Sequence, residues 1–492
     1  MDLHNIKTLG ELRQAGYKSK TVQEELRSNL IEKISKGETV FKGILGYEDT
    51  VIPELERAIL SGHSINLLGL RGQAKTRLAR LMVNLLDEYI PVISGSEIND
   101  DPFQPVSHFG KTMVDELGDN TPIDWLHRSQ RYVEKLATPD VTVADLIGDL
   151  DPVKAINQKL SYSDEKAIHF GLIPRSNRSI FVINEIPDLQ ARIQVALFNI
   201  LQEGDIQIRG FKMRLPLNIQ FVFTANPEDY TNRGSIITPL KDRIGSQIIT
   251  HYPKDIETAA AITASEAKIK KQQTERVIVH ELLAKAVEQI VFEARQSEFV
   301  DAKSGVSARL SISAFELLVS TIERRSIKNH DAVSHGRIAD LYQLVPAITG
   351  KVEMVYEGET EGPLKVAQNL ISKAIRQLFA EHCPPLEKMK KKGNDSSNPY
   401  KGIMQWFEEG KHLDLMVEDK DTTYRKQLDS LPELEEFVDR HYNASSQDER
   451  YLMKELILFG LSENSKLSRN SGDRQIRFKD LLGSMFTGFS NE

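Results

Sequence analysis

The sequence predicts an α/β protein with a parallel sheet in its first half and helices in its second half. Three short apolar runs, at residues 64–68, 179–183 and 219–224, indicate buried strands, because their apolar residues do not alternate with polar ones. A segment with helical periodicity at 189–203 lies between two of them, and strands that alternate with helices form parallel sheets. From Pro253 onward the pattern is helical, with few strand signals.

The length of 492 residues exceeds what one ordinary core holds, so we expect several domains. Changes in pattern divide the chain into an N-terminal helical arm at 1–35, an α/β domain at 36–252, a helical domain at 253–350, and a linker with a helical extension at 351–492. Within these, 90–94 is expected to form a second strand, 97–135 is polar and irregular, and 351–363 is expected to be an acidic linker or hairpin.

Composition narrows the class of protein. The net charge of −8 argues against general nucleic-acid binding, because no basic excess exists to neutralise phosphates. A single cysteine, Cys383, excludes an intramolecular disulfide framework. The N-terminal residues lack the basic and apolar regions of a signal peptide, and no apolar run approaches the ~20 residues of a membrane span. We therefore expect a cytoplasmic protein that does not enter a membrane.

A phosphate-binding pattern follows the first strand. Residues 69–76 read Gly-Leu-Arg-Gly-Gln-Ala-Lys-Thr, which fits G-x-x-x-x-G-K-[ST] except that Ala74 takes the second glycine position. In such a loop the backbone N–H groups cradle phosphates, the lysine reaches the terminal phosphates and the hydroxyl ligates Mg²⁺. If position 74 needs a positive φ, alanine costs roughly 1 kcal/mol there. Either that backbone is helical or Gly72 provides the turn. The loop alone also fits an ordinary strand–turn–helix corner with a surface lysine.

Four polar residues follow in the order that a nucleotide-hydrolysing site needs, which is metal support, a positioned water and charge for the transition state. Glu185 comes directly after a buried strand and is a candidate to orient the water, and Asn226 ends the next strand. Arg243 is a candidate arginine finger, and Arg309 a candidate to reach the γ-phosphate. Taken singly, each has an ordinary alternative: a capping carboxylate, a turn residue, a partner of Asp242, and a solvated helix residue.

These motifs resemble those of AAA+ ATPases, and within them the branch of MoxR-type ATPases and magnesium-chelatase ATPase subunits. The resemblance covers residues 40–345, and the loop at 69–76 is similar to the MoxR pattern Gly-x-Pro-Gly-x-Ala-Lys-Thr, which carries alanine at the same place. The other matching segments, in chain order, are 137–151 (the helix-2 insert), 170–189 (the approach into Walker B), 206–216 (the pre-sensor hairpin), 219–227 (sensor 1) and 237–245 (the arginine-finger segment).

The resemblance implies that Mg-ATP binds between the subunits of a ring, expected to be a hexamer. Lys75 would bind the β- and γ-phosphates, Thr76 the metal, and Glu185 the attacking water, with Asn226 on the water's other side. Arg243 and Arg309 would complete the catalytic set. The expected nucleotide contacts are Gly46, Tyr47, Gly69, Leu70, Arg71, Gly72, Gln73, Ala74, Lys75, Thr76 and Arg77.

The chain departs from the family at the metal. Walker B ends Asp-Glu in the family, and here it reads Asn184-Glu185. Removing one negative charge about 5 Å from the metal, at an effective dielectric of ~20, forfeits roughly 3 kcal/mol per unit of metal charge. Desolvation of a carboxylate would offset much of this, and the amide oxygen still accepts from a metal-bound water. We expect Thr76 and Asn184 at the metal, and a working but slow ATPase.

The expected function is ATP-driven remodelling or activation of a protein partner, either chaperone-like or in metal insertion. Two alternatives remain: a nucleotide-gated assembly scaffold with weak or no hydrolysis, which Asn184 permits, and a DNA-remodelling protein, for which the basic residues of the 206–216 hairpin are the only signal. Members of this branch commonly work with a von Willebrand factor A-domain protein. The chain carries no Asp-x-Ser-x-Ser metal motif of that domain, so the resemblance implies that such a partner is a separate protein.

Overall fold

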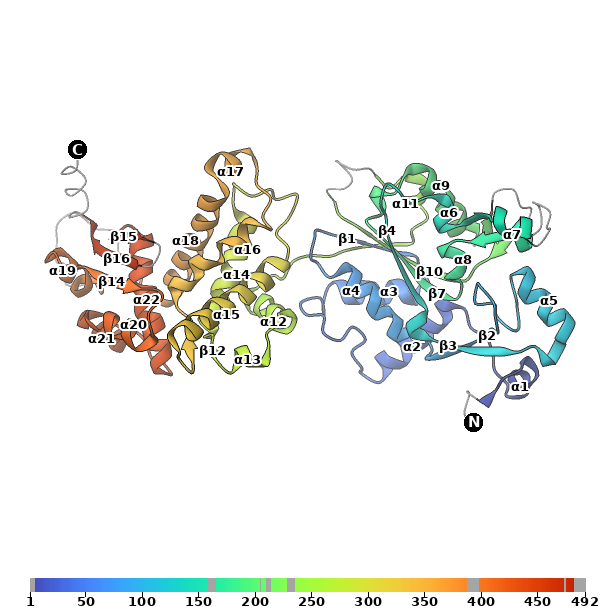
Figure 1. Ribbon diagram of the computed structural model, residues 1–492, viewed down its shortest axis with the longest axis horizontal. Coiled ribbons are helices and arrows are strands. Elements are labelled where there is room, and N and C mark those ends of the chain that lie inside the picture. The colour runs from blue at the N-terminus through green and yellow to red at the C-terminus, as the bar shows by residue number, and fades with distance from the viewer. Residues whose placement is uncertain are drawn as a thin grey trace. The chain divides into compact units, whose positions relative to one another are not determined.

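The computed structural model describes residues 5–157, 165–203, 205–208, 214–227, 235–386, 398–472 and 475–481. The chain separates into two compact units, Met1–Tyr252 and Pro253–Glu492 (Figure 1). The division falls at the end of the α/β segment that the sequence predicts. Across the described residues, no helix is long and apolar enough to cross a membrane.

The first unit is built on a five-stranded parallel sheet with the order β11-β1-β10-β7-β4. Its strands are β1 (Ile65–Leu68), β4 (Tyr132–Leu136), β7 (Ser179–Asn184), β10 (Ile219–Ala225) and β11 (Ser246–Ile249). Every residue of β7 and β10 is buried, as continuous apolar runs predict. The predicted α/β class with a parallel sheet is therefore confirmed.

Helices cover both faces of this sheet. On one face of the sheet, an apolar cluster joins side chains of β1, β7 and β10 to four helical elements: α2 (Val22–Ser35), α3 (Val51–Leu60), α4 (Lys75–Leu81) and the 3-10 turn η2 (Met82–Leu85). A second cluster joins the opposite residues of β7 and β10 to α6 (Val143–Leu146), α8 (Leu172–Arg175), α9 (Ala191–Glu203) and α11 (Thr238–Lys241). Residues that alternate along one strand thus enter two different layers.

The N-terminal segment is part of this unit and not a separate arm. Thr21 and Glu24 form a capping box that starts α2, and Val22, Leu26 and Leu30 repeat at helical spacing into the core. Glu25 of the same helix accepts two hydrogen bonds of 2.7 Å from the buried Arg131 guanidinium, just before β4. The preceding helix, α1 (Leu9–Gln14), packs through Leu12 against Ile123.

The region 97–135 is ordered structure, contrary to the irregular segment that we expected. It holds α5 (His108–Leu117), η3 (Gly118–Asn120), β3 (Ile123–His127), η4 (Arg128–Gln130) and most of β4. The strand expected at 90–94 is β2 (Tyr89–Ile93), but it pairs antiparallel with β3 outside the main sheet. Strand β4 takes the edge of the main sheet instead. None of its residues is fully buried, and its sequence, Tyr-Val-Glu-Lys-Leu, has no continuous apolar run like those of β7 and β10.

Two hairpins lie near the sheet. The 137–151 segment contains α6 and β5 (Gly148–Leu150), which pairs antiparallel with β6 (Ile168–Phe170); α7 (Pro152–Asn157) and η5 (Glu165–Ala167) lie between those strands in sequence. The hairpin predicted at 206–216 is confirmed as β8 (Asp205–Gln207) and β9 (Arg214–Pro216). Arg209 and Lys212 of that hairpin lie outside the described residues.

The second unit is mostly helical. Its elements are α12 (Ile256–Glu266), α13 (Lys271–Thr274), β12 (Val277–Ile278), α14 (Glu281–Gln296), α15 (Arg309–Asn329), β13 (Ser334–His335), η7 (Ile338–Leu344), α16 (Val345–Thr349), α17 (Tyr356–Glu361), α18 (Pro363–His382), α19 (Lys401–Glu408), β14 (Leu413–Met416), α20 (Asp421–Asp429), α21 (Pro432–His441), α22 (Gln447–Glu463), β15 (Leu467–Ser471) and β16 (Gln475–Asp480).

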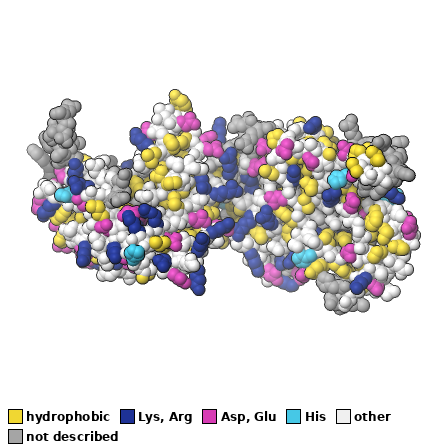
Figure 2. Space-filling model, in the orientation of Figure 1, with side chains coloured by type: hydrophobic (Ala, Val, Ile, Leu, Met, Phe, Trp, Pro, Cys, Tyr) yellow, Lys and Arg dark blue, Asp and Glu magenta, His cyan; other side chains and the backbone are white. Residues whose placement is uncertain are grey.

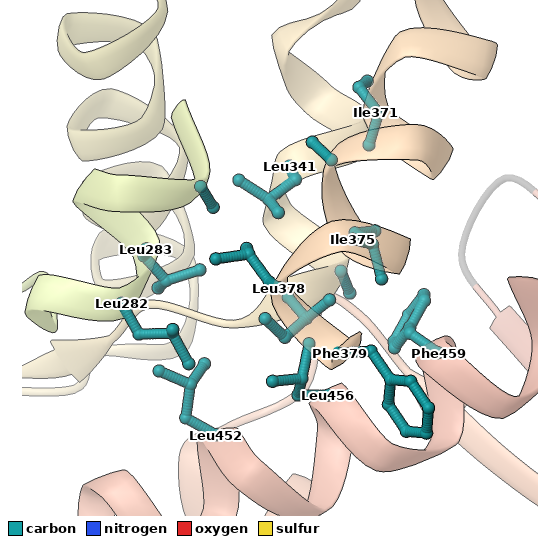
Figure 3. Close-up of a cluster of buried hydrophobic side chains, with 14 of the residues drawn as sticks. Leu282, Leu283, Leu341, Ile371, Ile375, Leu378, Phe379, Leu452, Leu456 and Phe459 are labelled. Atoms are coloured by element: carbon teal, nitrogen blue, oxygen red, sulfur yellow. The ribbon is translucent and has the colours of Figure 1, made fainter. Parts of the chain in front are cut away.

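One apolar core runs through this unit, so the expected boundary at residue 350 does not divide it. Leu282 and Leu283 of α14 lie against Leu378 of α18 and Leu452 of α22 in the same cluster (Figure 3). The segment 351–363, expected as a linker or hairpin, contains α17. The antiparallel sheet β14-β16-β15 was not predicted.

Candidate functional site

The candidate site forms where β1, β7 and β10 end. These strands are parallel and adjacent, so their carboxyl ends meet at one edge of the sheet, where α/β proteins bind ligands. The loop 69–74 follows β1, Glu185 follows β7 and Asn226 follows β10. The register places Leu68 opposite Ala225, which brings the loop beside Asn226.

The loop backbone takes the left-handed conformation twice. Gly72 has φ 72°, and Ala74, the residue before α4, has φ 55° and ψ 16°. Our alternative of a helical backbone at position 74 is therefore wrong, and alanine bears the cost of roughly 1 kcal/mol. Gly69 is needed for a different reason, since a Cβ there would lie 2.0 Å from Thr250 Oγ1 and 2.2 Å from Gln73 Oε1.

Lys75 is buried, with 7% of its surface exposed, which rules out the surface-lysine alternative. Its ammonium donates to the carbonyl oxygens of Gly69 and Leu70, the latter at 2.9 Å, and to Asn226 Oδ1 at 2.6 Å. The side chain therefore curls back over the loop that precedes it.

Asn226 connects the lysine to the acidic residue of the site. Its Nδ2 donates to Glu185 Oε2 at 2.6 Å, while its Oδ1 accepts from Lys75. An ammonium only donates and an ionised carboxylate only accepts, so the two partners fix which way the amide points. Glu185 has φ 57°, a left-handed conformation that is costly for a side chain of its size, and its backbone N–H donates to Thr224 Oγ1 at 3.2 Å. Such strain is concentrated at functional positions.

The oxygens expected to serve a metal also come together. Asn184 Oδ1 accepts from Thr76 Oγ1 at 3.3 Å and from Thr224 Oγ1 at 3.1 Å. The Thr76 hydroxyl and the Asn184 amide oxygen are oxygen ligands, the class that Mg²⁺ prefers. No cluster of three or more His, Cys, Asp or Glu side chains suited to a metal occurs in the described part of the chain. Mg²⁺ usually takes one or two protein ligands plus phosphates and waters, so this donor set fits it.

Tyr47 and two residues after β11, Thr250 and Tyr252, hold the loop by hydrogen bonds, and no sequence motif indicated Thr250 or Tyr252. Tyr47 donates to Gln73 O at 3.0 Å and to His251 O at 2.7 Å, Thr250 Oγ1 donates to Gln73 Oε1 at 2.7 Å, and Tyr252 donates to Arg71 O at 2.9 Å. Burial raises the pKa of Tyr47 to about 12, so it stays a donor. Tyr47, which we predicted to contact nucleotide, thus supports the loop. The turn before it is Gly46, with φ 79°.

The two predicted catalytic arginines, Arg243 and Arg309, make their contacts outside the 69–76 loop. Arg243 donates to Gln202 Oε1 at 2.8 Å and to Pro239 O at 2.9 Å, and its guanidinium covers the Phe198 ring at 3.9 Å. Arg243 also forms an ion pair with Asp242 at 3.4 Å, as the sequence alternative expected, so its contacts are with α9, α11 and Asp242 and not with the loop of the same chain. Arg309 begins α15 in the second unit, where its backbone N–H donates to Ser307 Oγ at 3.1 Å.

Comparison with known proteins bears on this geometry. Residues 123–244, which include Glu185, Asn226 and Arg243, match the AAA domain family (dynein-related subfamily). The chain is 28% identical over 231 residues to the magnesium-chelatase 38 kDa subunit of Rhodobacter capsulatus, covering 45% of this chain and 59% of that protein. It is 26% identical over 255 residues to the chloroplastic magnesium-chelatase subunit ChlI of Nicotiana tabacum, covering 50% of this chain and 56% of that protein. The match thus spans somewhat over half the length of these relatives.

Solved structures also match, at lower similarity. A BchI–BchD complex of magnesium chelatase gives 20% identity, a TM-score of 0.34 and coverage of 71% of this chain and 97% of that one. NtrX from Brucella abortus is 14% identical, with a TM-score of 0.34 and coverage of 60% of this chain and 55% of NtrX. Residues 123–244 thus form an AAA domain within the parallel α/β unit, and about half of the chain is similar to magnesium-chelatase subunits.

Proposed function

We propose that the protein binds Mg-ATP at the 69–76 loop and hydrolyses it. The observation that carries this proposal is the hydrogen-bonded chain Lys75–Asn226–Glu185 at the carboxyl edge of the sheet. It joins a buried cation, which suits phosphate, to a carboxylate, which suits a water, through an amide that touches both. An ordinary strand–turn–helix corner does not require these three groups to be hydrogen-bonded to one another.

In this proposal each residue has a defined task. The Lys75 ammonium exchanges its carbonyl partners on Gly69 and Leu70 for oxygens of the β- and γ-phosphates. Thr76 and Asn184 would hold Mg²⁺, which would supply positive charge to offset the negative charge that develops on the phosphates. Glu185 orients the attacking water, and Asn226 keeps that carboxylate in place. Catalysis of this kind consists mainly of positioning and electrostatic stabilisation.

The assembly and the task follow the relatives. We propose a ring, with hexamer as the expected state, in which Arg243 acts on the nucleotide of a neighbouring subunit, because its contacts hold it away from the loop of its own chain. Arg309 would reach the γ-phosphate from the helical unit. The ring would remodel or activate a protein partner, chaperone-like as in MoxR-type ATPases or in metal insertion, and that partner is proposed to carry a von Willebrand factor A domain.

One alternative keeps a specific observation in its favour. A nucleotide-gated scaffold with little hydrolysis fits the neutral Asn184 at the Walker B position. DNA remodelling gains no support, since the chain is acidic overall and acidic and basic side chains both occur over the visible face of each unit (Figure 2).

Nucleotide binding tests the proposal first. We expect the full-length protein to bind ATP in the presence of Mg²⁺ and Lys75→Ala to lose that binding, measured by calorimetric titration. Lys36→Ala, which removes an exposed lysine on the end of α2, is the control and should bind as the wild type does. Equal affinity of the Lys75→Ala and wild-type proteins would contradict the assignment.

A further inference from the structure

A second carboxylate stands beside the Walker B asparagine. Glu134 Oε1 accepts a hydrogen bond of 2.6 Å from Asn184 Nδ2. The two residues lie on neighbouring parallel strands, β4 and β7, with Leu136 opposite Asn184. No motif in the sequence marks Glu134, because β4 is a partly buried edge strand without an apolar run.

This contact fixes the direction of the Asn184 amide. An ionised carboxylate only accepts hydrogen bonds, so the NH₂ group of Asn184 must face Glu134. The amide oxygen then faces the hydroxyls of Thr76 and Thr224, at 3.3 and 3.1 Å. Asn184 is 8% exposed, so the three partners meet with little water between them. The Thr76 hydroxyl and the Glu134 carboxylate are therefore separated by a single amide group.

An amide placed between an anion and a metal site presents a more negative oxygen to the metal. A carboxylate that accepts from the amide N–H polarises the group and strengthens the negative end of its C=O, and such cooperativity is greatest away from water. An aspartate at position 184 would put two carboxylates in direct contact, and like charges that close do not both stay ionised. The asparagine is thus complementary to Glu134 in a way that an aspartate is not.

Glu134 has two other partners, and neither removes its charge from the site. Arg80 donates to Glu134 Oε2 at 2.9 Å and Tyr132 OH donates to the same oxygen at 3.0 Å. The Arg80 side chain is 65% exposed, so water screens its attraction, while Glu134 is 26% exposed and points its other oxygen at the buried amide.

We propose that Glu134 is a positioning residue which supplies, through the Asn184 amide, the negative charge that a Walker B aspartate would provide to Mg²⁺. This inference rests on the proposed Mg-nucleotide binding. In this proposal Glu134 on β4 takes the place of the Walker B aspartate charge, and Asn184 is the hydrogen-bonding partner of Glu134. The competing explanation is that Glu134 serves only in an ion pair with Arg80.

The test is the effect of Mg²⁺ on nucleotide affinity, which needs no turnover. The Kd of the non-hydrolysable analogue AMP-PNP is measured by calorimetric titration with Mg²⁺ and with EDTA, and the ratio of the two gives the metal coupling. Outer partners of metal ligands change metal affinity by about 10- to 100-fold, so Glu134→Gln should lower the coupling by about tenfold. Arg80→Gln removes the ion pair but keeps the carboxylate, and should leave the coupling unchanged or raise it.

A charge exchange provides the rescue. In Asn184→Asp with Glu134→Gln, the carboxylate moves to position 184 and the amide to position 134, and the coupling should return at least to the wild-type value. If Glu134→Gln alone does not fold, the double variant decides, since coupling tenfold below wild type would overturn the proposal.

Two results with the single variants also overturn the inference alone: wild-type coupling in Glu134→Gln, or an equal loss in Glu134→Gln and Arg80→Gln. In both, the wild-type protein still binds Mg-AMP-PNP and the proposed function stands. A wild-type protein that binds no AMP-PNP with or without Mg²⁺ overturns the proposed function itself, and this inference with it.

Discussion

At the scale of single residues, Ala74 shows what the loop requires. Its φ of 55° is the left-handed conformation that glycine adopts most readily, and Gly72 two residues earlier has the same sign of φ. Glu185 adopts it as well, with φ 57°. Two non-glycine residues of one site are therefore strained, and such strain persists only where the surrounding structure enforces it.

Ala74→Gly should raise the stability of the first unit. It relieves roughly 1 kcal/mol of strain and returns part of that through the larger entropy of the unfolded glycine, so we expect a rise in Tm of about 1–3 °C. Thermal unfolding of the full chain measures it. Ala79→Gly, the same substitution inside α4, should lower Tm, since glycine there costs about 1 kcal/mol. A fall in Tm of the same size in both variants would show that position 74 is not strained.

The sequence predicts some residues of the site and misses others for physical reasons. Glu185 and Asn226 are predictable because each follows an unbroken apolar run, and such runs in parallel strands end at one edge. Glu134 is not predictable, and neither is the role of Tyr47 as a support of the loop, because both depend on contacts with residues 50 and 26 positions away in sequence. Only the fold brings those residues together.

At the scale of elements, the second unit contains a buried acid between α22 and η7. Glu455 of α22 accepts a hydrogen bond of 2.6 Å from the Ile338 N–H, and Arg337 and Asp340 are the charged groups that act on it. The pKa of Glu455 is raised to about 8. Burial is the largest cause, Arg337 opposes it, and Asp340 adds to it. The carboxyl is thus neutral in the folded protein at pH values where it ionises in the unfolded chain.

This raised pKa gives the second unit a pH-dependent stability. The folded protein binds the proton more tightly, so its advantage is complete below the unfolded pKa of about 4.5 and is lost as the pH rises to about 8. Across that window the free energy of unfolding should fall by up to about 1.4 kcal/mol per pH unit. Glu455→Gln should flatten this dependence and be the more stable protein at pH 9.

Calorimetric Tm values from pH 5 to 9 provide the measurement. Glu408→Gln, at an exposed position on α19, is the matched control and should keep the wild-type slope. Equal slopes in the wild type and in Glu455→Gln would mean that another group causes the dependence.

The elements of the second unit also show where sequence patterns fail. Helices α14 and α18 are long and amphipathic and were expected as helices, whereas β14, β15 and β16 are short strands in a helical context. The sequence pattern does not reveal that the segments on either side of residue 350 share one core. That core joins α14, α18 and α22 through contacts between residues far apart in sequence.

At the scale of the whole molecule, the position of Arg243 bears on assembly. Its contacts with α9 and α11 hold it away from the loop of its own chain, which agrees with a role at the nucleotide of a neighbouring subunit. Arg243→Ala and Glu185→Gln should each be nearly inactive alone. A mixture of the two should recover part of the activity, because one kind of mixed interface keeps both groups.

Phosphate release from the mixed proteins measures this recovery. Mixing Glu185→Gln with Lys75→Ala is the control and should restore nothing, because both changes disable the loop side of the interface. If co-purification of differently tagged variants shows mixed rings and the first mixture still has no activity, Arg243 does not act between subunits.

The central claim is that this AAA+ protein hydrolyses Mg-ATP with Glu185 as the residue that orients the water. The most direct test is phosphate release at saturating ATP by full-length wild-type and Glu185→Gln proteins, with and without Mg²⁺. We predict Mg²⁺-dependent release by the wild type, and retained ATP binding with release at least about 100-fold slower in Glu185→Gln, the range for loss of a catalytic acid–base group. Equal release by the two proteins, or release that does not need Mg²⁺, would contradict the account.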